Sequence, residues 1–179
     1  MIKLGLLGNN ISKSEMPNLI TKLGNEFGFD VKYEIFDQAS KTDFNFKKFL
    51  SQIKEKNISG INVTYPFIEL ALEHSIKLSD ETKLVKSTNL ILINKSMPAH
   101  NTDFTGFMNT YKFNFNKEPS KLVVLGGGGV GKSVCFALLK LGVRELYIIE
   151  KDHIKLEKLI DDLKKQNKQV YSIKLGELI

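Results

Sequence analysis

Residues 122–133 read Leu-Val-Val-Leu-Gly-Gly-Gly-Gly-Val-Gly-Lys-Ser, an apolar run followed by a glycine loop and the start of a helical pattern. Gly126, Gly128 and Gly131 fit G-x-G-x-x-G, the strand-to-helix turn of dinucleotide-binding proteins, with Gly129 and Val130 between them. Such a turn places a phosphate against backbone N–H groups at a helix N-terminus, where the helix dipole favours negative charge. These five residues are therefore the candidate cofactor-binding loop.

The same loop also fits the P-loop pattern G-x-x-x-x-G-K-S, because Lys132 and Ser133 follow Gly131. The dinucleotide fold requires in addition an acidic residue at the end of the next strand, about 20 residues on, to hold the adenosine ribose. Glu150 follows Ile148 and Ile149 and lies 19 residues after Gly131. We therefore favour dinucleotide binding and keep a small P-loop NTPase as the weaker alternative. A carboxylate at Glu150 opposes a 2′-phosphate, which favours NAD over NADP.

Apolar patterns typical of strands and helices alternate along the whole chain, which predicts an α/β fold. We expect an N-terminal α/β substrate-binding domain over residues 1–102, a connecting helix and linker over 103–118, and the first half of a Rossmann-type parallel sheet domain over 119–179. The expected strands cover residues 2–7, 31–35, 58–63, 88–93, 121–125, 145–150 and 169–174. The expected helices cover 15–28, 43–56, 79–86, 103–112, 129–141 and 153–166, with a further one beginning at Pro66.

Composition excludes several classes of function. The net charge is +6, but only Arg144 among the 26 basic residues is an arginine and the lysines are interspersed with acids, so no nucleic-acid surface is expected. The one cysteine, Cys135, forms no internal disulfide, and the three histidines show no metal-ligand spacing, so no metal is expected. No apolar run approaches the ~18 residues of a membrane span. We expect a cytoplasmic protein with no membrane partner.

Three further motifs occur at Gly60–Pro66, Asn101–Phe107 and Gly8–Pro17, and together they resemble those of one family, the shikimate and quinate dehydrogenases. Gly60–Pro66, read Gly-Ile-Asn-Val-Thr-Tyr-Pro, resembles that family's G-x-N-V-T-x-P segment. Asn101–Phe107 resembles its N-T-D-x-x-G-F segment, and Gly8–Pro17 resembles its opening loop. With the glycine loop, four motifs occur in the order and spacing of the family, closest to its NAD-preferring quinate/shikimate branch.

The resemblance implies a site for a polyhydroxy cyclohexene or cyclohexane carboxylate. Ser14 would hold the carboxylate, whereas Asn62, Thr64, Asn89 and Asp103 would bind ring hydroxyls, with Asp103 also catalytic. The reaction would be hydride transfer between a ring hydroxyl and NAD(P), the 3-dehydro form being the ketone. Thr64 as a helix N-cap and Asp103 as a first-turn acid are the structural alternatives. A homodimer is the candidate assembly.

Two departures from the family bear on activity. The family's catalytic lysine falls on Ile68, and isoleucine cannot supply general acid–base catalysis, so we expect impaired turnover. Lys86 could reach the pocket, although a surface position fits it better. Only one mononucleotide half follows Ser120, so we expect a complete member to have on the order of 100 more residues, and interpret the sequence as truncated or as a short gene product. A non-catalytic ligand- or nucleotide-binding relative is the alternative function.

Overall fold

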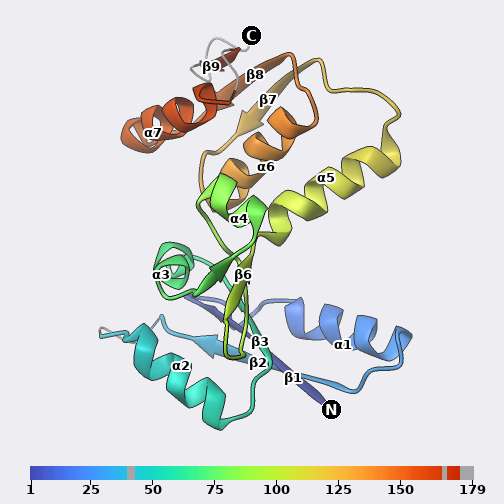
Figure 1. The fold of residues 1–179 in the computed structure, drawn as a ribbon, viewed down its shortest axis with the longest axis vertical. Helices are drawn as coiled ribbons and strands as arrows, with labels where there is room; N and C mark the ends of the chain where they lie inside the picture. The colour runs from blue at the N-terminus through green and yellow to red at the C-terminus, as the bar shows by residue number, and fades with distance from the viewer. Residues whose placement is uncertain (40–42, 167–168, 174–179) are drawn as a thin grey trace. The chain divides into compact units, whose positions relative to one another are not determined.

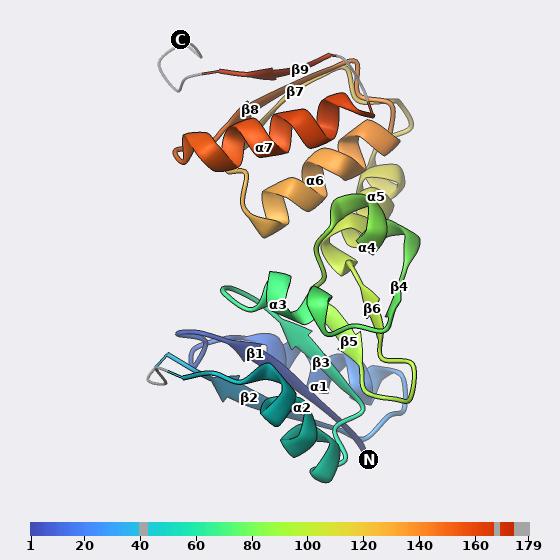
Figure 2. The ribbon, with the colours of Figure 1, turned by 60° about the vertical axis from the view of Figure 1, so that its left-hand side comes forward.

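The computed structural model describes residues 1–39, 43–166 and 169–173, and the chain divides into two compact units, residues 1–101 and 102–179. Figures 1 and 2 show the elements of both units. The first unit ends at Asn101, one residue before the end of the expected first domain at residue 102. The expected connecting helix, α5 (Thr102–Asn114), packs against α6 (Gly129–Lys140) and so forms part of the second unit.

The first unit is a six-stranded mixed sheet with the strand order β2-β1-β3-β5-β6-β4. Strand β1 pairs in parallel with β2 and β3, whereas β5 runs antiparallel to both β3 and β6. The strands are β1 (Ile2–Gly8), β2 (Val31–Asp37), β3 (Gly60–Val63), β4 (Lys77–Leu78), β5 (Leu90–Leu92) and β6 (Pro98–His100). The helices are α1 (Met16–Glu26), α2 (Phe46–Glu55), α3 (Ile68–Glu73) and α4 (Asp80–Val85).

Alternating side chains of β2 direct helices α1 and α2 to opposite faces of this sheet (Figure 2). Gly24 of α1 lies so close to Val31 that a methyl group on it would stand 2.5 Å from the valine side chain. Phe49 of α2 packs edge-on against Phe36, with 5.3 Å between ring centroids. The α2 face carries the apolar core, whose buried members include Leu7, Phe49, Ile53, Ile61, Val63 and Ile91.

The second unit contains a parallel three-stranded sheet with the order β7-β8-β9. The strands are β7 (Lys121–Leu125), β8 (Glu145–Ile149) and β9 (Val170–Ser172), and α7 (His153–Lys164) joins β8 to β9. Sequential neighbours in a parallel sheet, each joined through a helix, form the βαβαβ arrangement that the sequence predicts. Residue 174 of the expected last strand lies outside the described residues.

Three details of the first unit differ from the prediction. Residues 77–78 form β4 and residues 98–100 form β6, whereas no strand was expected between residues 63 and 88 or between residues 93 and 121. Both strands are too short to show an alternation of apolar and polar residues in the sequence. In the structure they are recognised because they pair with each other. Helix α3 begins at Ile68 rather than at Pro66, after a turn in which Phe67 N–H bonds the Thr64 carbonyl at 3.0 Å.

Candidate functional site

The carboxyl ends of β1, β2 and β3 lie at one edge of the first sheet, because these three strands are parallel. The opening loop leaves β1 at this edge and carries Ser14, which is half-buried. The Ser14 N–H donates to the Ile11 carbonyl at 2.9 Å, and its Oγ accepts from the Met16 N–H at 3.3 Å, where α1 begins. The loop is thus ordered by its own backbone up to the start of the helix.

Thr64 follows β3 directly and stands against the opening loop. A methyl group on Gly8 would lie 2.5 Å from the Thr64 side chain and 2.9 Å from that of Ile11, so only glycine allows this approach. The Asn9 N–H also donates to the Tyr65 carbonyl at 3.1 Å. Phe67 is the N-cap of α3 and no side-chain hydrogen bond caps that helix, so the capping alternative for Thr64 does not hold.

Asn62 cross-links three segments of the first unit. Its Oδ1 accepts from the Tyr33 hydroxyl at 2.9 Å, and its Nδ2 donates to the Asn89 carbonyl at 3.3 Å. Burial raises the pKa of Tyr33 to about 12, so the phenol is neutral and donates this bond. The Asn89 carbonyl also accepts from the Val63 N–H at 2.9 Å. The Asn62 amide therefore holds Asn89 beside the end of β3, a supporting role that the sequence motif did not reveal.

The other residues that the sequence analysis singled out lie at the ends of β6, α3 and α4 or in α5. His100 ends β6, and Asp103 follows it by three residues in the first turn of α5, in the second unit. Ile68 is half-buried and is the first residue of α3. Lys86 is exposed and ends α4 in the left-handed backbone conformation (φ 53°). Ser14, Thr64 and Asn89 are thus the expected ligand groups that the first unit brings to one edge.

The glycine loop has the geometry of a dinucleotide turn. Gly126 has φ 94°, a conformation that favours glycine, and its N–H bonds the Ile149 carbonyl at 2.7 Å. A methyl group on Gly131 would collide with the carbonyl oxygen of Gly126, so α6 can begin this close to β7 only with glycine there. Gly128 faces open space and no side-chain hydrogen bond caps α6 there. The first turn of α6 also lacks acidic residues, which leaves it suited to a phosphate.

Glu150 lies beside this loop, as the sequence predicts. Its Oε2 accepts from the Gly127 N–H at 2.6 Å, and its Oε1 accepts from the Asp152 N–H at 3.0 Å. The N–H groups of Asp152 and Gly127 hold the pKa of the Glu150 carboxyl below its usual range. The side chain is therefore ionised at neutral pH and placed to meet a ribose next to the loop.

The helix after the loop argues against a P-loop. Ser133 is fully buried, and its Oγ bonds the Gly129 carbonyl at 2.9 Å within α6. A P-loop serine has to present its hydroxyl to a magnesium ion instead. The P-loop interpretation of residues 126–133 is therefore disfavoured, because the Ser133 hydroxyl is buried and bonded within the helix.

Other reactive side chains give no sign of a separate centre. Cys135 is fully buried in α6, and burial raises its pKa to about 12, so the thiol is unreactive. Within the described ranges, no group of three or more histidine, cysteine or acidic side chains could hold a metal ion. In the same residues, no helix combines the length and the apolar character of a membrane span.

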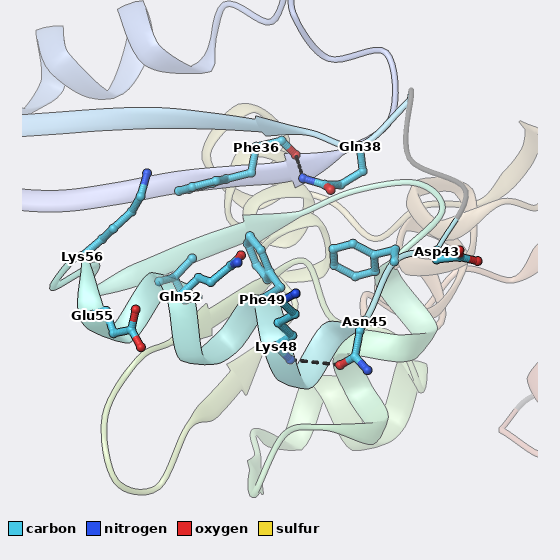
Figure 3. Close-up of a pocket in the computed structure, with 11 residues that line it drawn as sticks. Phe36, Gln38, Asp43, Asn45, Lys48, Phe49, Gln52, Glu55 and Lys56 are labelled. Carbon is cyan, nitrogen blue, oxygen red and sulfur yellow. Dashed lines mark hydrogen bonds between the residues drawn. The ribbon is translucent and has the colours of Figure 1, made fainter.

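A cavity of about 630 Å³ lies between β2 and α2 (Figure 3). Phe36 and Phe49 form part of its apolar wall, while Lys48 and Lys56 belong to its polar lining. None of the expected site residues lines it. It is a hollow beside the apolar core, and its lining residue Gln38 donates its N–H to the Gly8 carbonyl at the end of β1 at 2.9 Å.

Two residues at the site edge were not expected from the sequence. Asp37 ends β2 and accepts hydrogen bonds from four backbone N–H groups, three of them in the opening loop. The Asn9 Oδ1 is buried and has no hydrogen-bond donor among the described residues. An acidic residue ending a strand beside a glycine-bearing loop is the signal that could have pointed to Asp37.

Comparison with known proteins agrees with this geometry. Residues 6–91 match the family model of the shikimate dehydrogenase substrate binding domain. The structure superposes on quinate dehydrogenase from Corynebacterium glutamicum in complex with NAD, with TM-score 0.84 and 26% identity, over 97% of this chain and 64% of that one. The first unit of the chain is thus similar to the substrate binding domain of shikimate dehydrogenases. The α/β fold expected from the sequence is thereby confirmed.

Two further relatives show how much of a complete shikimate dehydrogenase the chain spans. Shikimate dehydrogenase (NADP(+)) of Caldicellulosiruptor saccharolyticus is 26% identical over 163 residues, which make up 89% of this chain and 57% of that protein. Shikimate 5-dehydrogenase from Thermus thermophilus, in complex with NADP(H) and shikimate, gives TM-score 0.77 at 25% identity, over 97% of this chain and 63% of that one. The chain thus spans about three fifths of the length of these relatives. Because relatives are named with NADP as well as NAD, the comparisons do not support the expectation that NADP is the less suited cofactor.

The glycine loop yields a matched pair of substitutions. Gly131→Ala should lower the free energy of unfolding by about 1–3 kcal/mol, because its methyl group collides with the Gly126 carbonyl. Gly128→Ala should leave it nearly unchanged, because Gly128 has φ −68° and open space around it. Urea unfolding of both variants is the measurement. Equal losses of stability would contradict the close approach of α6 to β7.

Proposed function

We propose that the protein is a shikimate/quinate dehydrogenase-type oxidoreductase. The first unit binds a polyhydroxy cyclohexene or cyclohexane carboxylate, and the second binds a nicotinamide dinucleotide. The observation that carries this proposal is the juxtaposition at one edge of the first sheet: the Ser14 loop, Thr64 and Asn89 are joined there through backbone bonds at positions that match the family motifs. When bound, the dinucleotide supplies the hydride acceptor.

The proposed roles follow from the chemistry of the side chains. Ser14 donates a hydrogen bond to the ligand carboxylate, and Asn62, Thr64 and Asn89 bond ring hydroxyls. Asn62 also holds Asn89 in place. Asp103 accepts the proton of the reacting hydroxyl as the hydride leaves, so the ring carbinol becomes a ketone. Gly126, Gly128, Gly129, Val130 and Gly131 hold the pyrophosphate, and Glu150 holds the adenosine ribose.

Ile68 supports a second candidate function, a binding protein with little or no turnover. A lysine at this position would supply the ammonium group that keeps Asp103 ionised and relays the proton. Isoleucine at position 68 supplies no ammonium group. Ligand binding without detectable turnover is the outcome that separates this candidate from the enzyme.

The homodimer and the cytoplasmic location stay predictions. Light scattering tests the homodimer, which should have twice the 20.3 kDa mass of one chain.

Ligand binding is tested on the proposed ring site. Thr64→Val and Asp103→Ala should each weaken shikimate or quinate binding by about 5- to 100-fold, because each removes a hydrogen-bonding partner of a ring hydroxyl. Thr110→Val on the exposed side of α5 is the matched control and should leave affinity unchanged. Isothermal titration calorimetry measures the constants. If both site variants bind shikimate and quinate with the affinity of the parent chain, the proposed ring site is contradicted.

Cofactor choice is tested on Glu150. We propose a preference for NAD, because an ionised carboxylate accepts ribose hydroxyl bonds and repels a 2′-phosphate. NAD should therefore raise the melting temperature of the second unit more than NADP, and Glu150→Ser should narrow that difference. Glu157→Ser, an exposed glutamate of α7, is the control for lost charge. Tighter NADP binding by the unmodified chain would refute the preference.

Turnover is tested on Ile68. Ile68→Lys should raise the rate by about 10-fold or more, with a smaller change in substrate affinity, because the ammonium group supplies a proton partner. Steady-state formation of NADH or NADPH from shikimate or quinate, on the longest natural form of the protein, is the assay. Ile76→Lys, which adds a lysine at a 69% exposed site, is the control. High parent activity that Ile68→Lys leaves unchanged would mean that another group, such as Lys86, carries the proton.

A further inference from the structure

The carboxylate of Asp37 collects four backbone hydrogen bonds at the edge that carries the proposed ligand groups. Its Oδ1 accepts from the N–H of Asn10 at 3.0 Å and of Ala39 at 3.0 Å. Its Oδ2 accepts from Ile11 at 2.9 Å and Ser12 at 3.1 Å. Three consecutive N–H groups of the opening loop thus converge on one side chain from the neighbouring strand.

This convergence requires an unusual loop backbone and an ionised partner. Asn10 has φ 56°, in the left-handed region, and backbones of this kind form concave nests of N–H groups that bind anions. The N–H groups of Ala39, Asn10, Ile11 and Ser12 hold the pKa of the Asp37 carboxyl below its usual range. Hydrogen bonds to an ionised acceptor are stronger than neutral ones, so the charge orders the loop.

A continuous set of bonds links Asp37 to Ser14. Ile11 donates its N–H to Asp37 and accepts the Ser14 N–H at its carbonyl, at 2.9 Å for each bond. Ser14 in turn accepts from the Met16 N–H at the start of α1. We propose that Asp37 is a positioning residue: it fixes residues 10–12 so that the Ser14 hydroxyl meets the ligand carboxylate. This inference rests on the proposed function of the ring site.

The test compares Asp37→Asn with Asp30→Asn. Asparagine at position 37 offers one acceptor oxygen and a donor NH₂ group, so two of the four N–H groups lose their acceptor. Shikimate affinity should fall by about 10-fold or more. Asp30 is exposed and precedes the same strand at its other end, so Asp30→Asn removes the same charge and should leave affinity unchanged. If Asp37→Asn does not fold, Asp37→Ser, which also keeps one acceptor oxygen but has no NH₂ group, should likewise lower shikimate affinity.

A double-mutant cycle separates positioning from general stabilisation. Ser14→Ala should weaken binding in the parent chain but add little in the Asp37→Asn chain, because Ser14 is already misplaced there. If Ser14→Ala weakens binding equally in both backgrounds, or if Asp37→Asn binds as tightly as the parent chain, the positioning role of Asp37 is overturned. The proposed function is untouched by either result. Absence of shikimate and quinate binding by the parent chain would overturn the proposed function and the inference together.

The loop itself gives a direct readout in the unmodified chain. The amide signals of Asn10, Ile11, Ser12 and Ala39 in a nitrogen-15 NMR pH titration should report one shared protonation below the usual range of an aspartate pKa. Because this pKa is lowered in the folded state, the ordering by Asp37 is present above it and is lost as the pH falls through it. If the amides of Asn10, Ile11, Ser12 and Ala39 show no shared titration, the proposed ordering of the loop by Asp37 is contradicted.

Discussion

Parallel pairing of neighbouring strands is the constraint on which both units depend. In the first unit it brings the ends of β1, β2 and β3 to one edge, and in the second it does the same for β7 and β8. Loops that follow parallel strands can therefore carry convergent polar groups. This arrangement places Ser14 and Thr64 at the carboxyl ends of strands in the first sheet. It likewise places the glycine loop and Glu150 at the carboxyl ends of strands in the second sheet.

Close backbone approach is the second requirement, and glycine meets it in both units. Gly8 lets Thr64 and Ile11 pack against the end of β1, and Gly131 lets α6 begin against the carbonyl of Gly126. This close approach explains why glycine is required at both positions: a side chain on Gly8 or Gly131 would displace the loop that follows. The polar groups then act at distances set by the backbone rather than by flexible side chains.

The sequence predicted the elements whose signals are local. Alternating and helical patterns placed β2, α2 and α7 within a few residues, and the glycine spacing with Glu150 predicted the contact between loop and carboxylate. What it missed depends on tertiary contacts. Strands β4 and β6 are defined by pairing with distant partners, and the role of Asn62 depends on Tyr33, a residue 29 positions away. Asp37 was missed because the donors that bond its carboxylate are backbone N–H groups, which no side-chain motif records.

The central claim is that the edge formed by the Ser14 loop, Thr64 and Asn89 is a ring-carboxylate site. A titration of the nitrogen-15 labelled chain with shikimate, followed by amide chemical shifts, tests it most directly. The account predicts saturable shifts concentrated in residues 9–14 and at Thr64 and Asn89, with residues lining the cavity between β2 and α2 unaffected. Saturable shifts confined to that cavity, or no saturable shifts with either shikimate or quinate, would contradict it.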